Sequence, residues 1–303
     1  MPWRRTLVIL SALLCLIFSL SASADQLDHW VWRQPQPFSL QVNAVAHGNG
    51  LWALFANSGM VATSPDGIEW DLANAATNAL FINAAFGNGR FVATSSRGVL
   101  YSMDGHSWFP AAGSGSIRNV AFGNGLFFGA DGIHLNIWRS TDGSNWTSQA
   151  LGGLSHFNTA SFANNRYFMI GTDYTYRNYL LYTSTDATNW TGPVALGTNN
   201  ILKIVYGNGV YVGINNVSTL TTSWSEFRTS TDGTTWSDPT AVTNTLVNDI
   251  VFANGQFVAL DAGGQVFLSP DGTNWSTHAV PDLFAAFTLG WNDGQFLASG
   301  VFG

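Results

Sequence analysis

The fold is decided by the stretch Ser64-Pro65-Asp66-Gly67-Ile68-Glu69-Trp70, because five variants of it follow along the chain. The pattern is Ser-x-Asp-Gly-x-x-Trp, and we call it the box. Its Asp and Trp residues are Asp66 and Trp70, Asp104 and Trp108, Asp142 and Trp146, Asp186 and Trp190, Asp232 and Trp236, and Asp271 and Trp275. Only the fourth copy departs, with Ala187 in place of Gly. The copies recur about every 40 residues, and such a period indicates stacked supersecondary units.

A second phrase, close to Phe-Gly-Asn-Gly-x-Phe, precedes each box and occurs once more after the last one. Its seven copies begin at His47, Phe86, Phe122, Phe162, Tyr206, Phe252 and Trp291. Asn-Gly between two apolar runs predicts a β-hairpin, because both residues tolerate the positive φ of a type I′ turn. Each repeat therefore predicts a hairpin, a third strand, the box turn and a fourth strand, which together form the blade of a β-propeller.

Seven hairpins and six boxes leave one blade incomplete. Trp30 and Trp32 precede Gly48 by 18 and 16 residues, and a box Trp precedes the matching position of the next hairpin by 15 to 17. We therefore predict an all-β, seven-bladed propeller, closed by pairing of the N-terminal strand with strands from residues 284–300. Such closure would remove an exposed sheet edge. The alternative is a six-bladed ring.

The first 24 residues have the features of a signal peptide. Arg4 and Arg5 begin the segment, an apolar stretch runs from Leu7 to Leu20, and Ala22-Ser23-Ala24 is a small-residue cleavage site. We expect residues 1–24 to be removed and residues 25–303 to form one domain in the periplasm or outside the cell. An uncleaved anchor is the alternative. After cleavage no membrane span remains, and Cys15, the only cysteine, is lost.

The composition restricts the classes of partner. The chain carries 11 basic and 18 acidic residues, a net charge of −7, and its only lysine is Lys203. A basic surface for nucleic acid is therefore not expected. The six histidines are scattered without the short spacings of a metal site. We expect no cofactor and no metal, and a monomer.

The box resembles the Asp-box, or BNR repeat, of sialidase-like and photosystem II assembly-factor-like propellers, here of an exported bacterial type. The resemblance covers essentially the whole mature chain. It implies that the box turns lie on the face opposite the ligand site. The Asp and Ser oxygens can accept backbone N–H bonds within the turn, and the Trp can anchor neighbouring sheets. We therefore interpret the box residues as structural.

The connections between the second and third strands are longest in blades three to five, and we expect them to share one face. Their candidate ligand-binding residues are Asp131 and His134 in blade three, Asp173, Tyr174, Tyr176 and Arg177 in blade four, and Trp224 and Glu226 in blade five. Aromatic rings beside amide and guanidinium groups suit a protein partner or a carbohydrate. The alternative is that these aromatic side chains pack on each other.

The innermost strands predict a second candidate site at the mouth of the central channel. Strand alternation places one polar set on the channel side: Asn43, Asn83, Asn119, Thr159, Lys203, Asp249 and Thr288. Small residues two positions later, such as Ala85 and Ser161, suit a narrow channel. We choose Asn119, Lys203 and Asp249 as candidates and expect Lys203 to pair with Asp249. The alternative is hydrogen bonding between blades with water in the channel.

The resemblance also raises the question of catalysis. Sialidase-like enzymes use a Tyr nucleophile with a nearby Glu, and the family adds three arginines for the substrate. This chain has only Glu69, inside a box, and Glu226. We assign no catalytic residue and predict a non-enzymatic scaffold for protein interaction or assembly. The alternatives are a glycan-binding module and a glycoside hydrolase, either sialidase-like or using Asp173, Asp249 or Glu226.

Overall fold

The computed structural model describes residues 40–75, 78–131, 136–198, 200–218, 221–243, 245–280 and 286–300. The chain divides into two units, Met1–Val31 and Trp32–Gly303, and every described residue belongs to the second. The predicted signal peptide and the predicted N-terminal strand at Trp30 and Trp32 lie outside the described residues.

Each repeat folds into an antiparallel sheet whose strands follow one another in chain order. The six four-stranded sheets, here called blades 1 to 6, are β1 (Val42–Gly48), β2 (Leu51–Ala56), β3 (Met60–Ser64) and β4 (Asp71–Asn74); β5 (Phe81–Gly87), β6 (Arg90–Ser95), β7 (Gly98–Ser102) and β8 (Phe109–Pro110); β9 (Ile117–Gly123), β10 (Leu126–Asp131), β11 (Asn136–Ser140) and β12 (Thr147–Ala150); β13 (His156–Ala163), β14 (Arg166–Thr172), β15 (Tyr179–Ser184) and β16 (Thr191–Gly197); β17 (Ile201–Gly207), β18 (Val210–Ser218), β19 (Ser223–Ser230) and β20 (Thr240–Thr243); and β21 (Val247–Ala253), β22 (Gln256–Asp261), β23 (Gln265–Ser269) and β24 (Ser276–Ala279). A single 3-10 turn, η2 (Asn57–Gly59), joins β2 to β3.

The prediction of seven blades is wrong. Among the described residues only six sheets have four strands, and the last hairpin, β25 (Ala286–Asn292) with β26 (Gln295–Gly300), forms a two-stranded sheet. The protein is therefore a six-bladed β-propeller with a small additional sheet. The physical reason is that a blade needs a box turn to join its third and fourth strands. The sequence has six boxes.

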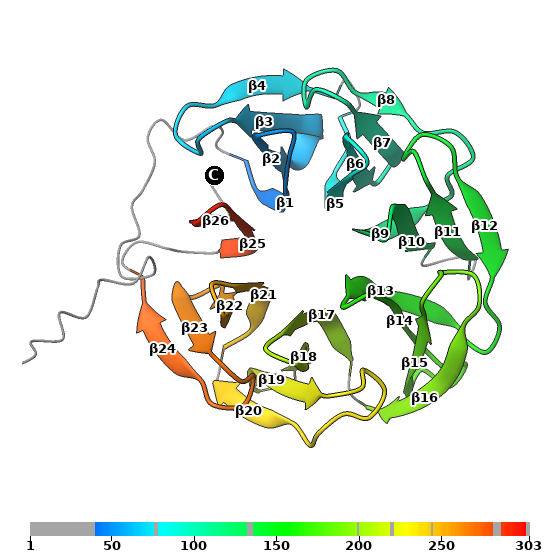
Figure 1. The fold of residues 1–303 in the computed structure, drawn as a ribbon, viewed down its shortest axis with the longest axis vertical. Coiled ribbons are helices and arrows are strands. Elements are labelled where there is room, and N and C mark those ends of the chain that lie inside the picture. Colours follow the sequence, from blue (N-terminus) through cyan, green and yellow to red (C-terminus); the bar gives the residue numbers. More distant parts are fainter. Residues whose placement is uncertain are drawn as a thin grey trace, which may run out of the picture. The chain divides into compact units, whose positions relative to one another are not determined.

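The sheets of the second unit are arranged around a central channel (Figure 1). The first strand of each sheet is the innermost one, and the fourth strands form the outer rim. The two-stranded sheet lies between blades 6 and 1, because β25 contacts both β21 and β1. Every strand pair within a sheet is antiparallel, so the hairpin turns and the box turns lie at one end of the ring. The connections between second and third strands lie at the other end, which we call the long-loop face.

The Asn-Gly turns have the predicted type I′ character. Asn88 and Gly89, for example, have φ angles of 46° and 73°. The Asn side chain has a second role, because its Nδ2 donates to carbonyl oxygens of the next blade. Asn88 Nδ2 lies 2.8 Å from both Gly125 O and Thr141 O, in the hairpin and the box of blade 3. Asn49 and Asn208 make the same pair of bonds, so these three hairpin turns tie their blades to the next one.

The glycine before the Asn-Gly turn allows close contact between neighbouring blades. A Cβ atom added at Gly87 would lie 2.2 Å from the ring of Phe122, the corresponding aromatic residue of the next blade. The same relation holds for Gly48 with Phe86 and for Gly123 with Phe162, where the distance would be 2.1 Å. A side chain at these positions would have to displace a packed ring. The Phe-Gly pair of the repeat is thus a contact between blades.

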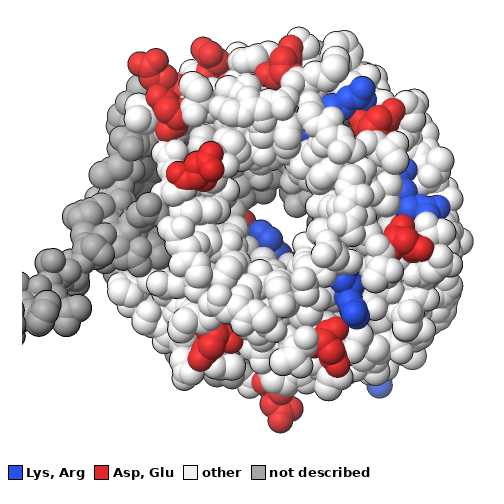
Figure 2. Space-filling view, in the orientation of Figure 1, with Lys and Arg blue, Asp and Glu red and all other residues white. Residues whose placement is uncertain are grey.

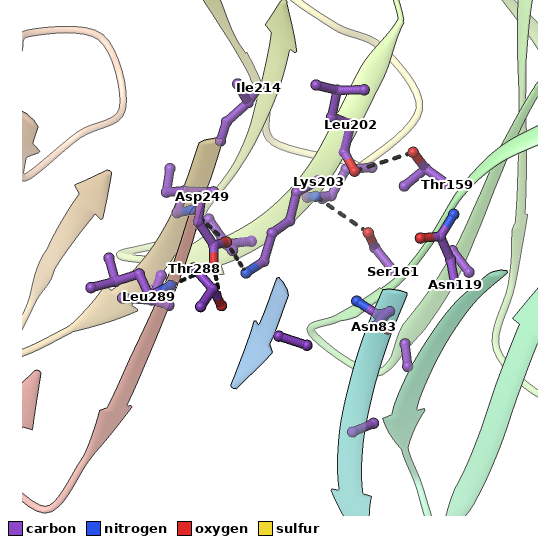
Figure 3. A pocket seen from close by; sticks show the side chains of 18 of the residues that line it. Asn83, Asn119, Thr159, Ser161, Leu202, Lys203, Ile214, Asp249, Thr288 and Leu289 are labelled. Carbon is purple, nitrogen blue, oxygen red and sulfur yellow. Dashed lines mark hydrogen bonds and ion pairs between the residues drawn. The ribbon is translucent and has the colours of Figure 1, made fainter. Parts of the chain in front are cut away.

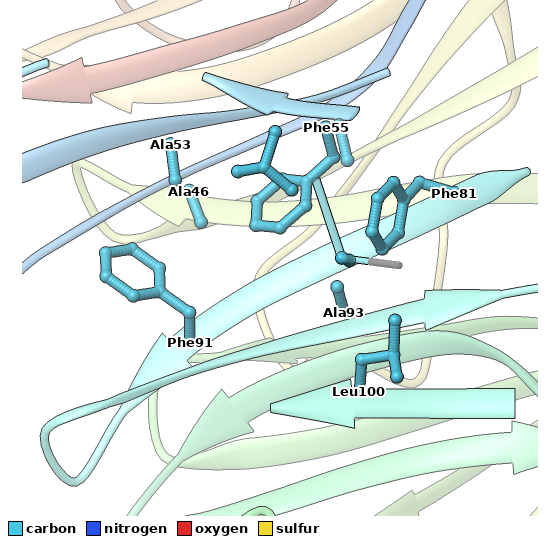
Figure 4. Packing of buried hydrophobic residues seen from close by; sticks show 10 residues of the cluster. Ala46, Ala53, Phe55, Phe81, Phe91, Ala93 and Leu100 are labelled. Carbon is cyan, nitrogen blue, oxygen red and sulfur yellow. The ribbon is translucent and has the colours of Figure 1, made fainter. Parts of the chain in front are cut away.

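Apolar side chains fill the spaces between adjacent blades. Figure 4 shows the cluster between blades 1 and 2, where Phe55 of β2 lies against Phe81 of β5 with 5.3 Å between ring centroids. Both rings are buried, as are Phe91 and Leu100 in the same cluster. The core is therefore a series of interfaces around the ring.

The box turn satisfies its own polar groups. In the second box the Asp104 carboxylate accepts N–H bonds from His106 at 2.8 Å and Ser107 at 2.7 Å. Ser102 Oγ donates to Asp104 Oδ1 and accepts from Gly105 N. The indole of Trp108 donates to Gly105 O at 3.0 Å. All six boxes bond the Asp carboxylate to backbone N–H groups in this way.

We expect Gly87→Ala to destabilise the protein by about 1–3 kcal/mol, because the new methyl group overpacks the Phe122 contact. Gly152→Ala is the matched control, since nothing lies within 4 Å of a Cβ atom there. Urea denaturation monitored by tryptophan fluorescence measures both changes. Equal midpoints for the two variants would contradict the role assigned to the Phe-Gly contact.

The box aspartates predict acid sensitivity. Backbone N–H bonds, the largest from Ser107, lower the pKa of Asp104 from 3.8 to about 2. A carboxylate whose pKa is lower in the folded state stabilises the fold above its unfolded pKa, and this stabilisation is lost as the pH falls toward the folded pKa. The urea midpoint should therefore fall between about pH 4 and pH 2. In Asp104→Asn this decline should be shallower, and an unchanged slope would refute the assignment.

Candidate functional site at the channel mouth

The innermost strands line a central cavity of about 630 Å³. Each strand contributes one residue at the same register position: Ala44, Asn83, Asn119, Thr159, Lys203, Asp249 and Thr288. The sequence prediction named Asn43 for the first strand; Asn43 does line the cavity, but it lies one position before the equivalent residue. Asn43 is the residue that a β-bulge leaves without a partner on β2, and Ala44 takes the place in register with Asn83.

The same bulge occurs in all seven inner strands, and its residue serves to join blades. Asn43 Nδ2 donates to Phe81 O of the next blade at 2.9 Å. Asn248, at the equivalent position in β21, donates to Ala286 O at 2.7 Å. Bulges re-aim side chains, and here they direct two amides sideways to a neighbouring strand.

Several residues of the polar ring also bond across blades. Asn119 Nδ2 donates to Asn158 O at 2.7 Å, and Thr159 Oγ1 donates to Leu202 O at 3.1 Å. Asn83 Oδ1 accepts from Val120 N at 3.0 Å. The alternative interpretation of the polar ring, hydrogen bonding between blades, is therefore correct for these side chains. Each still has a second polar atom or face directed at the cavity.

Lys203 and Asp249 form the predicted ion pair across blades 5 and 6 (Figure 3). The Asp249 carboxylate has three further donors. Its Oδ1 accepts from Ile250 N at 2.8 Å, and its Oδ2 accepts from Leu289 N at 2.7 Å and from Thr288 Oγ1 at 3.4 Å. Four donors therefore fill the four acceptor sites of this carboxylate. Asp249 also joins blade 6 to the two-stranded sheet.

The loop between β14 and β15 is organised by Asp173. Its carboxylate accepts from Thr175 Oγ1 and from Asn178 Nδ2, each at 2.7 Å, and from backbone N–H groups of the loop. These hydrogen bonds, the largest from the Asn178 side chain, hold the pKa of Asp173 well below its usual range. Tyr174 and Tyr176 are left 68% and 69% exposed, more than any other large hydrophobic residue described. Arg177 beside them is also exposed.

The blade 5 candidates lie on strands, although a loop was expected there. Glu226 is in β19, opposite Asn215 of β18, and its carboxylate accepts from Asn215 Nδ2 at 3.2 Å and from Trp224 Nε1 at 3.1 Å. Trp224 is half-buried and faces Val217 across the hairpin. The insertion in this repeat therefore lengthens the β18–β19 hairpin at the long-loop face.

The predicted residues do not form one site. Asn119, Lys203 and Asp249 line the cavity, whereas Asp173, Tyr174, Tyr176, Arg177, Trp224 and Glu226 do not. Asp131 is buried at the end of β10, and His134 lies outside the described residues. Asn83 and Ser161 also line the cavity and were not chosen as site residues. Their position on the channel side of the strand was the available signal.

No group of three or more His, Cys, Asp or Glu side chains in the described part of the chain is placed to hold a metal ion. Within the same residues, no helix has the length and apolar character that a membrane span requires.

No protein-family model matches the sequence, and no curated protein matches it. Solved structures do match. The likeness shows a β-propeller fold. The structure of YCF48 bound to D1 peptide is 14% identical, with a TM-score of 0.68 over 88% of this chain and 92% of that chain. Catalytically inactive virginiamycin B lyase from Staphylococcus aureus with quinupristin is 10% identical, with a TM-score of 0.69 over 89% and 94%. BamB from Moraxella catarrhalis is 12% identical, with a TM-score of 0.53 over 86% and 81%.

We expect Asp249→Ala to lower the free energy of unfolding by about 1–3 kcal/mol, because it leaves the buried Leu289 N–H without an acceptor. Lys203→Met should cost less, since Asp249 keeps three donors and the Lys203 side chain is 40% exposed. Urea denaturation of both variants measures this order. A larger loss in Lys203→Met would show that the charge pair between blades 5 and 6 stabilises the fold more than the bond from Asp249 to Leu289 N does.

Proposed function

We propose that this protein is a non-enzymatic scaffold that holds a segment of a partner protein on its long-loop face. The observation that carries the proposal is the blade 4 loop. It leaves Tyr174 and Tyr176 68% and 69% exposed on a backbone that the Asp173 carboxylate holds in place. Tyr and Arg dominate the energetics of protein interfaces. A rigid loop also loses little conformational freedom on binding.

The state of the candidate carboxylates supports binding over catalysis. A general base or nucleophile needs an acceptor that is free to meet the substrate. Asp249 is saturated by four donors, Asp173 is bonded within its loop, and Glu226 is bonded to Asn215 and Trp224. These hydrogen bonds favour a structural role for the three carboxylates.

The box turns support a finer assignment. Six turns share the Ser-to-Asp bond and the backbone N–H bonds to Asp, so we propose that they are repeats of the Asp-box, or BNR, type. We further propose that residues 1–24 are a signal peptide, that residues 25–303 form one exported domain, and that this domain is a monomer. Among the similar folds, YCF48 is a propeller with a bound peptide, which is the mode of binding proposed here.

Selection of phage-displayed peptides on the full chain tests the function. We expect selected peptides whose Kd rises at least tenfold in the Tyr174→Ser, Tyr176→Ser double variant, which corresponds to about 1.4 kcal/mol. Met103→Ser is the matched control, because Met103 is 56% exposed but lies in a box turn at the other end of the ring.

Three results would refute the proposal. One is the absence of any peptide that binds the protein above background. Another is a glycan array in which sugar binding, and not peptide binding, is lost in the tyrosine variant. The third is turnover of an aryl glycoside that disappears in Glu226→Gln, which would show an enzyme instead.

A further inference from the structure

The channel mouth has one cation whose hydrogen-bonding capacity is not used up. Among the described residues that line the cavity, Lys203 carries the only positive charge and Asp249 the only negative charge. Lys203 Nζ has three N–H donors, and Asp249 is its hydrogen-bond partner. Figure 2 shows a positively charged side chain within the central opening of the ring.

The partner of this cation does not depend on it alone. Asp249 is also held by Ile250 N, Leu289 N and Thr288 Oγ1. Because these three donors remain bonded to the carboxylate, the ammonium group of Lys203 can hydrogen-bond to a ligand without leaving Asp249 unpaired. Charge-assisted hydrogen bonds are roughly twice as strong as neutral ones, so Lys203 favours an anionic acceptor.

Two neutral donors face the same cavity. Asn83 uses Oδ1 to accept from Val120 N, and its Nδ2 group has no partner among the described residues. Ser161 Oγ accepts from Ile204 N at 3.4 Å, which leaves its O–H group to donate. Figure 3 shows Lys203, Ser161 and Asn83 around one space. Asn119 Oδ1 is one remaining acceptor there, and it carries no charge.

The blade that carries Lys203 also has the longest second strand among the described residues, and we call its β18–β19 hairpin the wall. Lys203 pairs with Ile214 of β18, and this strand continues to Ser218, about 13 Å further at the usual rise per residue. Trp224 pairs with Val217 on the same hairpin. A polypeptide segment lying against this wall would therefore lie on the long-loop face of the blade that carries Lys203.

We propose that the channel mouth is a receptor for an acidic side chain of the docked segment. The carboxylate is held by Lys203, with Asn83 and Ser161 as neutral donors. This inference rests on the proposed function and specifies which partner segments it accepts: extended segments with one Asp or Glu directed into the ring, beside residues that contact Tyr174 and Tyr176.

The only lysine of the chain provides a direct readout. We would label the full-length protein with ¹³C-lysine, so that Lys203 gives the only lysine Cε signal, and titrate it with the phage-selected peptides. Each Asp or Glu of a peptide is then replaced by Asn or Gln. One of these replacements should raise the Kd at least tenfold and abolish the shift of the Lys203 signal.

Asn83→Asp is the most informative variant. It keeps the acceptor for Val120 N, so the fold is retained, but it places a negative charge where the carboxylate would bind. Binding of the acidic peptides should fall at least tenfold, whereas Arg97→Ala, an exposed residue of the same face that does not line the cavity, should leave it unchanged. Lys203→Met should weaken binding as Asn83→Asp does.

The outcomes separate this inference from the proposed function. If peptides bind through the tyrosine loop but no acidic position matters and Lys203 does not shift, the acidic-side-chain receptor is refuted and the scaffold remains. If glucuronate shifts the Lys203 signal and the selected peptides do not, the carboxylate comes from a sugar acid and the inference is also refuted. Failure to select any peptide refutes the scaffold itself.

Discussion

The structure depends on the contact between an aromatic ring and the glycine backbone of the preceding blade. Phe122 occupies the space that a side chain at Gly87 would need, and the same contact repeats at Gly48 and Gly123. It sets how closely adjacent sheets approach at the inner end. The Asn-Gly turns and box turns then bond across the same interface. Because a closed ring accumulates every error in spacing, uniform contacts are needed for the inner strands to enclose one channel.

The two repeated phrases report different parts of a blade, and only the number of boxes equals the number of four-stranded blades. Asn-Gly turns report inner hairpins, of which there are seven. The box reports the turn between the third and fourth strands, of which there are six. The sequence prediction counted hairpins and supplied the missing strand from the N-terminus. An Asn-Gly turn reports only the two strands of its own hairpin. A complete blade also needs a third and a fourth strand, and the Asn-Gly turn gives no information about them.

The candidate site was predictable where strand alternation alone decides it. Alternation places Lys203 and Asp249 on the channel side of adjacent strands, and they pair. It fails at Asn43, which lies five residues before Gly48, whereas the equivalent residue of every other inner strand lies four residues before the matching position; Ala44 holds the equivalent place. The saturation of Asp249 was unpredictable, since one of its donors is the backbone N–H of Leu289 in a sheet 40 residues away. Likewise, Asp173 reads as a ligand-binding residue but braces its own loop.

The two-stranded sheet makes the ring unequal around its circumference. Within the residues that the structure describes, six sectors have four strands each and one has two, and the Asp249 carboxylate bonds that sector to its neighbour. Local opening in proteins begins where the fewest buried contacts and backbone hydrogen bonds must be broken. That sector is therefore the seam of the ring. We therefore expect local opening of the described ring to begin at the junctions of the two-stranded sheet.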